Sequence, residues 1–558
     1  MSATLENPTT EGLPQVVSGE VRAQRTTQRW VDWFLTVDHK QVGILYIVAA
    51  MVFFFLGGVE ALLMRAQLGV ADNTLITPEI YSQLFTMHGT TMLFLFLSPV
   101  LAGLASYLLP LMIGARNVAF PRLNALSFWL FLGGGIALYA TLFFTPPSAG
   151  WTSYPPLSGS VYSPSGGQDA WIFLFLLTGL ASVLAAINFT ATIINMRAPG
   201  LEWSRLPVYC WTVLAHSLLV IVSLPVAMAA SVMLLTDRNF GTAFFDPTAG
   251  GSPMLWHHLF WFFGQPQLFV LLLPVFGIIT EILPVFTGRK LFGYKAIVNA
   301  VFAIAGLSLI SWGSHTFTAP VSNGVNSIFM ITSLLLAVPV GVLILNWLAN
   351  LRGASIKADS PFLYAAGFLA LFSGGAIAGL LLAIFPIAWQ LDDTYFAVAQ
   401  FHDVMVGGGV FGVLAGLHYW FPKISGRSLN EKLAKASFAL IFVSFIITFL
   451  VQYSLGLEGM PRRVYEYNAD TGWQLENLIS TISSFLLGIG LVLAAANFVR
   501  SSTKGAKAGP DPWKGNTLEW FVPSPPPENN FDVIPEVDSL EPMREIRAEV
   551  ERGSGSRG

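Results

Sequence analysis

Long apolar segments separated by short polar stretches occupy most of the chain from residue 41 to residue 499. A helix needs about 20 mostly apolar residues to cross a bilayer. Twelve segments have this character, and they cover 41–64, 83–112, 125–146, 170–195, 208–235, 257–285, 296–318, 326–350, 362–388, 393–421, 433–456 and 476–499. Because the connections between them are mostly short, the pattern predicts an all-α polytopic membrane protein with one bundle of twelve transmembrane helices, not two domains.

The two ends of the chain are polar and flank this bundle. Residues 1–37 contain no apolar h-region, so we expect a flexible cytoplasmic leader and not a cleaved signal peptide. The membrane domain is expected to cover 38–500. Residues 501–558 are charged and proline-rich, which predicts a solvated cytoplasmic tail with one short polar helix near its end.

Composition agrees with a membrane protein and excludes several other classes. The chain is 54% hydrophobic and 11% charged, whereas soluble domains carry about 25% charged residues. We therefore expect membrane lipid to surround the bundle. A net charge of −3 gives no support for a nucleic-acid partner, and the single cysteine, Cys210, excludes an internal disulfide or a thiolate metal cluster.

Basic residues gather in alternate loops, which indicates the orientation of the bundle. The loops that we place on the cytoplasmic side contain Arg22, Arg25, Arg29, Lys40, Arg116, Arg122, Arg197, Arg205, Arg289, Lys290, Lys295, Arg352, Lys357, Lys423, Arg427, Lys432, Arg500, Lys504 and Lys507. Both termini are thus predicted to be cytoplasmic, in a multi-pass protein of a prokaryotic cytoplasmic membrane. On the outer side the exceptions are Arg65, Arg238, Arg462 and Arg463, which need a specific reason.

Two of the eight histidines are the strongest candidates for a functional site, because ionisable groups inside a membrane are expensive. His88 lies about five residues inside the outer end of the second span and His402 about nine inside that of the tenth, so at about 1.5 Å per residue both lie in the outer half of the bilayer. Two such imidazoles can ligate one haem iron from opposite faces, a low-spin arrangement without an open position for substrate. The alternative is two unrelated histidines that donate to backbone carbonyls.

The outer arginines strengthen the haem hypothesis. Arg65 ends the first span, and Arg462 and Arg463 lie in the outer loop between the last two spans. A haem between His88 and His402 would bring its propionates near this surface, and arginine suits bidentate pairing with carboxylates. Ordinary exposed arginines in a headgroup region remain the alternative.

The other histidines have weaker claims. His39 lies in the polar approach to the first span, and we favour structural roles for His216 and His418. His315 together with His257 or His258 has the residue types for a metal site, but no ligand spacing supports one.

Many ordered stretches of the sequence resemble subunit I of the haem-copper oxidases, specifically the A-type cytochrome c oxidases. They are DHKQVGILY (38–46), YLLPLMIGARNVAFPRLNALSFW (107–129), GWTSYPPLSG (150–159), INFTATIINMRAP (187–199), MLLTDRNFGTAFFDPTAGGSP (233–253), HLFWFFG (258–264), FHDVMVGGGVFGVLAGLHYWFP (401–422) and LGLEGMPRRVYEY (455–467). The resemblance implies a twelve-helix bundle with a low-spin haem and a second haem beside a copper ion.

The positions that serve the low-spin haem in the family are retained. Its two ligands fall on His88 and His402, and the arginine at the haem edge falls on Arg65. The resemblance also assigns the propionate arginines to Arg462 and Arg463, and the family's aromatic residue is present as Trp151.

The positions that serve the second haem and the copper are replaced. The family's high-spin haem ligand is Gln400 here, in QFHDV where the family has HFHYV. The family's three copper histidines fall on Gln265, Ser314 and His315, of which only the last is a histidine. Amide oxygens and hydroxyls are poor substitutes for imidazole toward copper.

The proton-handling positions of the family are also replaced. The acid of the HPEVY motif is Gln267 and the redox tyrosine is Phe269, while the two proton-channel residues are Asn117 and Leu343. An amide does not titrate in the usable range.

Three aspartates carry further expectations from the resemblance. Asp392 and Asp393 fall in the family's outer magnesium region, so an outer-side cation site is expected there. Asp403 replaces a tyrosine of the family and is either a new proton site or, as we favour, paired with a neighbouring polar group.

The leading hypothesis is a cytochrome c oxidase subunit I-like haem protein of a respiratory electron-transfer complex. It carries one bis-histidine low-spin haem of undetermined a or b type, without copper, a second haem or a retained oxygen-reducing site. Its expected partners are subunits like subunits II and III and an outer-side electron donor such as a cytochrome c or a cupredoxin. The two alternatives are a terminal oxidase or gas reductase with an atypical site, and a non-catalytic scaffold subunit. Gln265 and Gln267 are expected to hydrogen-bond within a pocket that has lost its metal.

Overall fold

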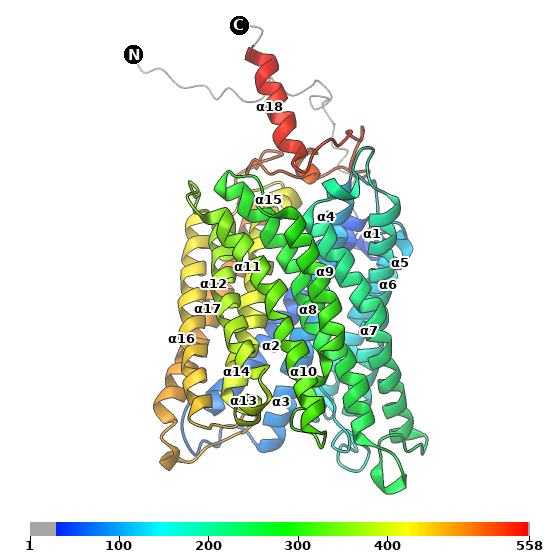
Figure 1. Ribbon diagram of the computed structural model, residues 1–558, viewed down its shortest axis with the longest axis vertical. Helices are drawn as coiled ribbons and strands as arrows, with labels where there is room; N and C mark the ends of the chain where they lie inside the picture. Colours follow the sequence, from blue (N-terminus) through cyan, green and yellow to red (C-terminus); the bar gives the residue numbers. More distant parts are fainter. Residues whose placement is uncertain (1–29, 556–558) are drawn as a thin grey trace.

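Twelve helical spans run roughly parallel in a single bundle in the computed structural model, which describes residues 30–555 (Figure 1). The described part of the chain contains no β-strand. The spans are His39–Gln67 (α2), Pro78–Ile113 (α3, η2 and α4), Pro121–Phe143 (α5 and η3), Gly166–Asn195 (α6), Val208–Asn239 (α7), Pro253–Thr287 (α8), Tyr294–Thr316 (α9 and η6), Asn323–Leu351 (α10 and α11), Ser360–Leu382 (α12), Tyr395–Ser425 (α14, η7 and α15), Glu431–Leu457 (α16) and Gln474–Lys504 (α17). The predicted fold class and number of spans are confirmed.

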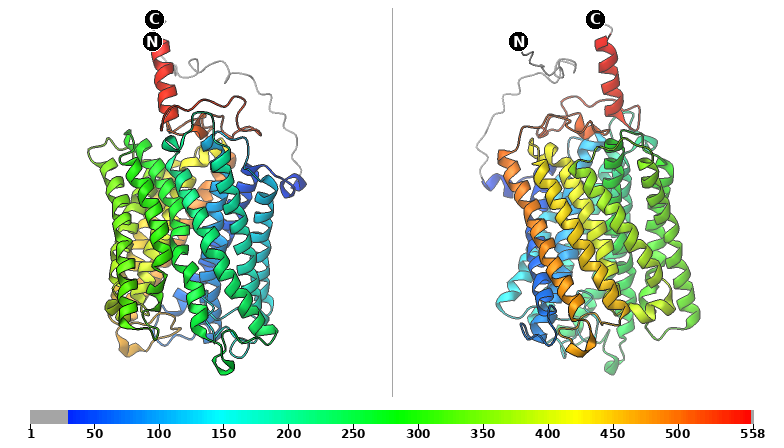
Figure 2. Two further views of the ribbon diagram at one scale, coloured as in Figure 1. Left: turned by 45° about the vertical axis from the view of Figure 1, so that its right-hand side comes forward. Right: turned by 90° about the vertical axis from the view of Figure 1, so that its left-hand side faces the viewer.

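Both described ends of the chain lie at the same end of the bundle, which we call the terminal end (Figures 1 and 2). The short helix α1 (Trp30–Phe34) lies beside it, and α18 (Pro542–Gly555) stands away from it. The opposite end, where α3 (Pro78–Thr90) and α14 (Tyr395–His402) begin, is called the far end. Residues 1–29 of the predicted leader lie outside the described residues.

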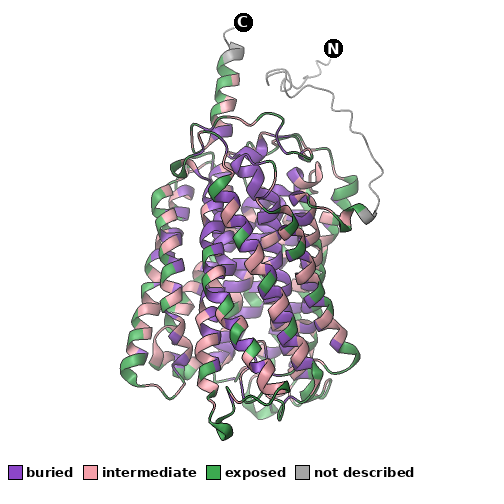
Figure 3. Cartoon of the chain, turned by 90° about the vertical axis from the view of Figure 1, so that its right-hand side faces the viewer, coloured by how far each residue is buried: buried purple, intermediate pink, exposed green. Residues whose placement is uncertain are grey.

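Three spans form the centre of the bundle. In the most apolar windows of the second, sixth and tenth spans, 83%, 83% and 94% of the residues are buried, against 22–50% in the other nine. Figure 3 shows this buried centre surrounded by helices with exposed outer faces. A central span contacts protein on all sides, whereas a peripheral span leaves one apolar face for lipid. The same three spans carry His88, Gln265 and His402.

The ninth span ends earlier than its hydropathy predicts. The sequence indicates a helix over 362–388, but α12 ends at Leu382 and a separate short helix, α13, covers Phe385–Leu391. Between them Ile384 has an extended backbone (ψ 107°), and Pro386 lies in the first turn of α13. Proline lacks the N–H that a continuing helix would use, so the apolar run is divided here.

The segment from 505 to 541, expected as a solvated extension, instead packs across the terminal end. Trp520, Phe531 and Asn530 are buried there, and Glu519 is fully buried. Lys423, at the end of α15 (Phe411–Ser425), donates to the carbonyls of residues 510, 522 and 523. The apolar aromatic side chains of this segment are better buried against the bundle than left in water. The predicted short polar helix near the end of the chain is confirmed by α18.

Candidate functional site

The two candidate haem ligands occupy equivalent positions in their helices. His88 lies in the last turn of α3, which passes directly into the π-helical segment η2 (Thr91–Leu97). His402 is the last residue of α14, which passes into a second π-helical segment, η7 (Asp403–Val410). π-Helical turns are rare and occur frequently at functional sites.

The rings of His88 and His402 lie close together with nearly parallel planes. Their centroids are 6.5 Å apart and their planes differ by 13°. Two imidazole nitrogens bound on opposite sides of one metal ion, each by a bond of about 2.0 Å, place the ring centroids roughly 6 Å apart. The separation therefore fits two axial ligands of a single iron.

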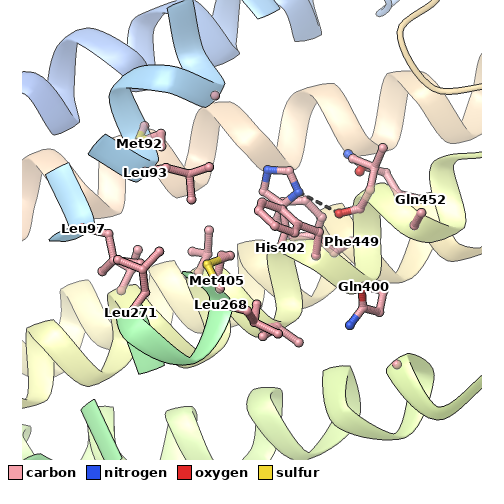
Figure 4. Close-up of a pocket in the computed structure, with 18 of the residues that line it drawn as sticks. Met92, Leu93, Leu97, Leu268, Leu271, Gln400, His402, Met405, Phe449 and Gln452 are labelled. Atoms are coloured by element: carbon pink, nitrogen blue, oxygen red, sulfur yellow. Dashed lines mark hydrogen bonds between the residues drawn. The ribbon is translucent and has the colours of Figure 1, made fainter. Parts of the chain in front are cut away.

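Backbone carbonyls orient both rings for ligation. Nδ1 of His88 lies 2.8 Å from the Gly57 carbonyl of α2, and Nδ1 of His402 lies 2.7 Å from the Val398 carbonyl one turn earlier (Figure 4). When Nδ1 donates its proton to a carbonyl, Nε2 keeps its lone pair for a metal. The sequence left open that the two histidines only bond to carbonyls. These bonds are present, and they also leave Nε2 of each ring free to act as a ligand.

Phe449 of α16 holds the second ring in place, and the sequence pattern did not point to it. Its ring lies against His402 (Figure 4) and stacks on it, with centroids 4.7 Å apart and an angle of 16° between the planes. An apolar phenylalanine in a lipid-spanning helix gives no local signal of such a role, because its function depends on which residue faces it.

A cavity of about 1520 Å³ surrounds the two histidines. Its walls come from the three central spans and from α2, η6, α10, α11, α12, α13, α16 and α17. Pockets for one small ligand are about 300–1,000 Å³, so this cavity has room for more than one. The residues labelled in Figure 4, among them Met92, Leu97, Leu271 and Met405, give its walls an apolar character.

Arg65 lines the cavity with unused hydrogen-bonding capacity. Its Nη2 donates to the Asn477 carbonyl (2.9 Å), to Asn477 Oδ1 (3.1 Å) and to Thr481 Oγ1 (3.1 Å). Its Nε and Nη1 are buried and have no partner among the described residues. A buried donor without a partner is costly, so these two atoms fit an acceptor on a bound group. Arg65 is buried, which excludes the ordinary exposed arginine that the sequence left open.

Arg462 and Arg463 lie where the cavity reaches the far end of the bundle, and Trp151 contributes to the same wall. The guanidinium of Arg463 lies 5.3 Å from the ring centroid of Phe85, and burial and the charge of Arg462 lower the pKa of Arg463. Cationic donors at the end of an apolar slot fit the carboxylates of a haem bound between the histidines.

Asp392 and Asp393 lie beside these arginines. Arg462 Nη2 is 2.7 Å from Asp393 Oδ1 and 3.9 Å from Asp392 Oδ2. Burial raises the pKa of Asp392, although the charge of Arg462 opposes this shift. Within residues 30–555 no group of three or more His, Cys, Asp or Glu side chains is arranged to hold a metal ion. The two carboxylates that the sequence suggested for a cation are instead close to the guanidinium of Arg462.

Two of the residues at the family's copper positions, Gln265 and His315, are hydrogen-bonded to each other. His315 Nε2 lies 2.8 Å from Gln265 Oε1, and the His315 ring stacks on Trp261 with centroids 3.5 Å apart. His257 uses its Nε2 to bond the His315 carbonyl, so it does not face a shared metal with His315. The predicted hydrogen bonding of Gln265 within the pocket is confirmed.

The remaining replaced positions differ in where they lie. Gln267, Phe269, Ser314 and Gln400 line the cavity. The Gln400 Nε2 is 3.3 Å from the Gly375 carbonyl of α12, and Figure 4 shows its side chain on the other side of α14 from His402. Gln267 forms no hydrogen bond with any described residue, which is not what we expected for it.

Asn117 and Leu343, the positions of the family's proton channels, do not line the cavity. Asn117 lies in the loop after α4 (Ser98–Ile113), where its Oδ1 accepts from the Val118 backbone at 2.8 Å. Leu343 is fully buried in α11 (Ala337–Leu351).

The residues that line the cavity fit one metal group of the family and not the others. The histidine pair, the unpartnered Arg65 atoms and the cationic far end fit one low-spin haem. A copper ion does not fit, because one histidine with amide and hydroxyl neighbours is a poor donor set for it. A second haem lacks an axial histidine at Gln400.

Other polar groups in the spans have structural partners. Nδ1 of His39, His216 and His418 lies 2.7–2.8 Å from a backbone carbonyl, as predicted for structural histidines. Tyr453 donates to Asp403 at 2.9 Å, which confirms the favoured pairing of that aspartate. Arg238, an exception on the outer side, bonds Asp169 and three loop carbonyls.

Comparison with known proteins gives a consistent result. Residues 41–486 match the family model of Cytochrome C and Quinol oxidase polypeptide I. This chain belongs to that family. Cytochrome c oxidase subunit 1 of Bacillus subtilis is 44% identical over 521 residues, which are 93% of this chain and 83% of that protein. The corresponding subunit of Thermostichus vulcanus is 43% identical over 511 residues, or 91% of this chain and 92% of that protein.

A solved structure supports the fold independently. The cryo-EM structure of a haem-copper terminal oxidase dimer matches with a TM-score of 0.71 and 17% identity, over 84% of this chain and 85% of that one. At this identity the likeness shows the fold alone. Membership of the oxidase family implies haem cofactors, a place in the membrane and other oxidase subunits as partners.

Proposed function

We propose that this oxidase-family protein is an electron-transfer subunit that binds one bis-histidine haem and does not reduce oxygen by the mechanism of its relatives. One observation carries the proposal: His88 and His402 are arranged as a ligand pair, while the copper positions are held together by a hydrogen bond between Gln265 and His315. The positions for the low-spin haem are retained, whereas most positions for the copper and the second haem are replaced.

The described residues would divide the work of this site among them. His88 and His402 would hold the iron through Nε2, with Nδ1 of each ring oriented by a carbonyl. Arg65, Arg462 and Arg463 would hold the polar edges of the ring, and the apolar walls would exclude water. A six-coordinate haem supplies reversible one-electron transfer and leaves no position for oxygen.

The expected environment follows from the family. Electrons would come from a donor at the far end, such as a cytochrome c or a cupredoxin, and pass to or through subunits like subunits II and III. We place the protein in a prokaryotic cytoplasmic membrane with both termini in the cytoplasm. A site for a cation at Asp392 and Asp393 stays a prediction.

The test is the metal and haem content of purified full-length protein. We expect one haem per chain by pyridine haemochrome, a low-spin spectrum that carbon monoxide leaves unchanged, and no stoichiometric copper by elemental analysis. Two haems per chain, a carbon monoxide-sensitive band or one copper per chain would refute the proposal.

The second candidate is a terminal oxidase or gas reductase with an atypical site, and the 44% identity to a named oxidase subunit favours it. Cyanide-sensitive oxygen consumption by the purified complex, together with copper, would establish it. A scaffold role predicts instead that His88→Ala impairs assembly and leaves the electron flux of each assembled complex unchanged.

A further inference from the structure

One part of the cavity wall is lined by uncharged polar side chains. We call it the amide chamber; its polar residues are Gln265, Gln267, Gln400, Ser314 and Ser333. They come from four different spans, and Phe269 and Phe372 complete the wall with aromatic rings. The chamber is continuous with the space around His88 and His402, so the side chains of the replaced positions do not fill it.

Some of these polar groups have no hydrogen-bond partner within residues 30–555. Gln267 is 6% exposed, lines the chamber and forms no hydrogen bond with a described residue. The Oγ of Ser333 in α10 (Asn323–Leu335) is buried and has no partner in the described part of the chain. Leaving such groups unpaired costs free energy of folding, so their arrangement points to a ligand with hydrogen-bonding atoms.

The ligand that fits the amide chamber has no net charge. Among the described residues, the Asp, Glu, Lys and Arg side chains that line the cavity are Arg65 of α2 and, at the far end, Asp392, Asp393, Arg462 and Arg463. Two histidines also line the cavity beside these residues: Nε2 of His315 is bonded to Gln265 Oε1, and Nε2 of His257 to the His315 carbonyl. Amides and hydroxyls both donate and accept, which suits carbonyl and hydroxyl oxygens and gives an ion no counter-charge.

The chamber reaches the lipid-facing surface between α11 and α12. Leu345 and Ile377, one from each helix, both line the cavity and are each 67% exposed. Gly341 of α11 also lines the cavity, and a Cβ at this position would meet no atom within 4 Å. An apolar opening at this place admits molecules from the membrane and disfavours ions from water.

We propose that the amide chamber binds an uncharged, membrane-soluble molecule whose head group carries carbonyl or hydroxyl oxygens and whose apolar tail lies between α11 and α12. The head would bond Gln267 and Ser333, with the aromatic rings against its apolar part. A quinone or a neutral glycerolipid has this chemistry. The inference rests on the proposed function, because a copper ion or a second haem would occupy the same space.

Equilibrium binding to full-length haem-loaded protein in nanodiscs tests the inference. The probes are tritiated decylubiquinone and 1-monodecanoylglycerol, with decanoate as a charged counterpart. We expect saturable binding of an uncharged probe, weakened about tenfold by Gln267→Leu through loss of one hydrogen bond. Decylubiquinone binding would identify a ring-bearing ligand, and monodecanoylglycerol binding would identify a glycerol head.

Two glycine variants provide a matched pair. Gly341→Leu places bulk in open space inside the chamber and should abolish binding. Gly374→Leu also meets open space, but on an exposed face of α12 outside the cavity, and should bind as the unchanged protein does. The haem spectrum confirms that each variant is folded.

The inference is overturned if neither uncharged probe binds saturably, if decanoate binds equally well, or if Gly341→Leu binds as Gly374→Leu does. Haem and copper are measured on the same samples. A second haem or copper would overturn the proposed function, whereas one haem without copper and without probe binding would overturn this inference alone.

Discussion

At the scale of single residues, the role of each histidine in the spans depends on the groups that surround its ring. His88 and His402 each have Nδ1 bonded to a carbonyl, so Nε2 of both rings is available as a ligand, and the ring centroids are 6.5 Å apart. His418, on the same span as His402, also has Nδ1 bonded to a carbonyl, but its ring packs against Tyr364 and Phe498. Similar local hydrogen bonds thus accompany different roles, and the facing residue decides between them.

This difference gives a matched test. His402→Gln should lower the haem content of purified protein at least tenfold, because loss of an axial ligand removes a metal bond as well as ring stacking. His418→Gln should retain the haem, since that histidine does not line the cavity. Pyridine haemochrome per chain is the measurement, and equal haem content in the two variants would contradict the assignment of His402.

At the scale of elements, the segment from 505 to 541 is held by buried charge as well as by apolar contacts. Glu519 Oε1 accepts from Trp420 Nε1 at 3.0 Å and from Thr517 Oγ1 at 2.7 Å, and Oε2 has no partner among residues 30–555. Burial raises the pKa of the Glu519 carboxyl above its ordinary value of 4.5, although its hydrogen bonds and the charge of Lys423 oppose the shift. Burial also raises the pKa of Asp511 in the same segment.

The packing of this segment should therefore weaken as the pH rises. A carboxyl whose pKa is raised in the packed state binds its proton more tightly there, so the packed state is favoured near pH 4.5 and loses this advantage as the pH passes the raised value. Hydrogen exchange of residues 510–531 should accordingly be faster at pH 8 than at pH 5, after correction for intrinsic rates.

Glu519→Gln isolates the cause of this pH dependence. Glutamine can still accept from Trp420 and Thr517 but does not titrate, so most of the difference between pH 5 and pH 8 should disappear. Glu528→Gln changes an exposed carboxyl of the same segment and serves as the control. If both variants keep the full pH dependence, the buried carboxyl is not its source.

At the scale of the whole molecule, the orientation follows from charges that lie far apart in the sequence. The basic loops gather at the terminal end, while Arg65, Arg238 and Arg462 at the other end each have acceptors in the protein. The positive-inside tendency then predicts that the terminal end faces the cytoplasm.

The single native cysteine makes this orientation simple to measure. Cys210 is fully buried, so an introduced cysteine can be labelled against a low background. Asp470→Cys at the far end should react with a membrane-impermeant maleimide in intact cells, and Thr503→Cys at the terminal end only after permeabilisation. The reverse pattern would show that the termini face outward.

The helical spans could be predicted from the sequence, because they depend on local properties of the chain. The twelve spans follow from apolar length alone, because each helix must satisfy its own backbone in lipid. The identity of the retained and replaced positions, such as His88 and Gln265, is also written in the sequence. The break after Leu382 was missed because the hydropathy of the apolar run continues past it.

Only the tertiary structure decided how these residues meet. It placed the two histidine rings 6.5 Å apart with nearly parallel planes, joined Gln265 to His315 across two spans, and left the amide chamber open beside them. It also packed a polar-looking tail against the terminal end. Apolar length and residue type are local properties of the chain, whereas distance, facing and enclosed volume arise from helix packing between segments that the sequence keeps far apart.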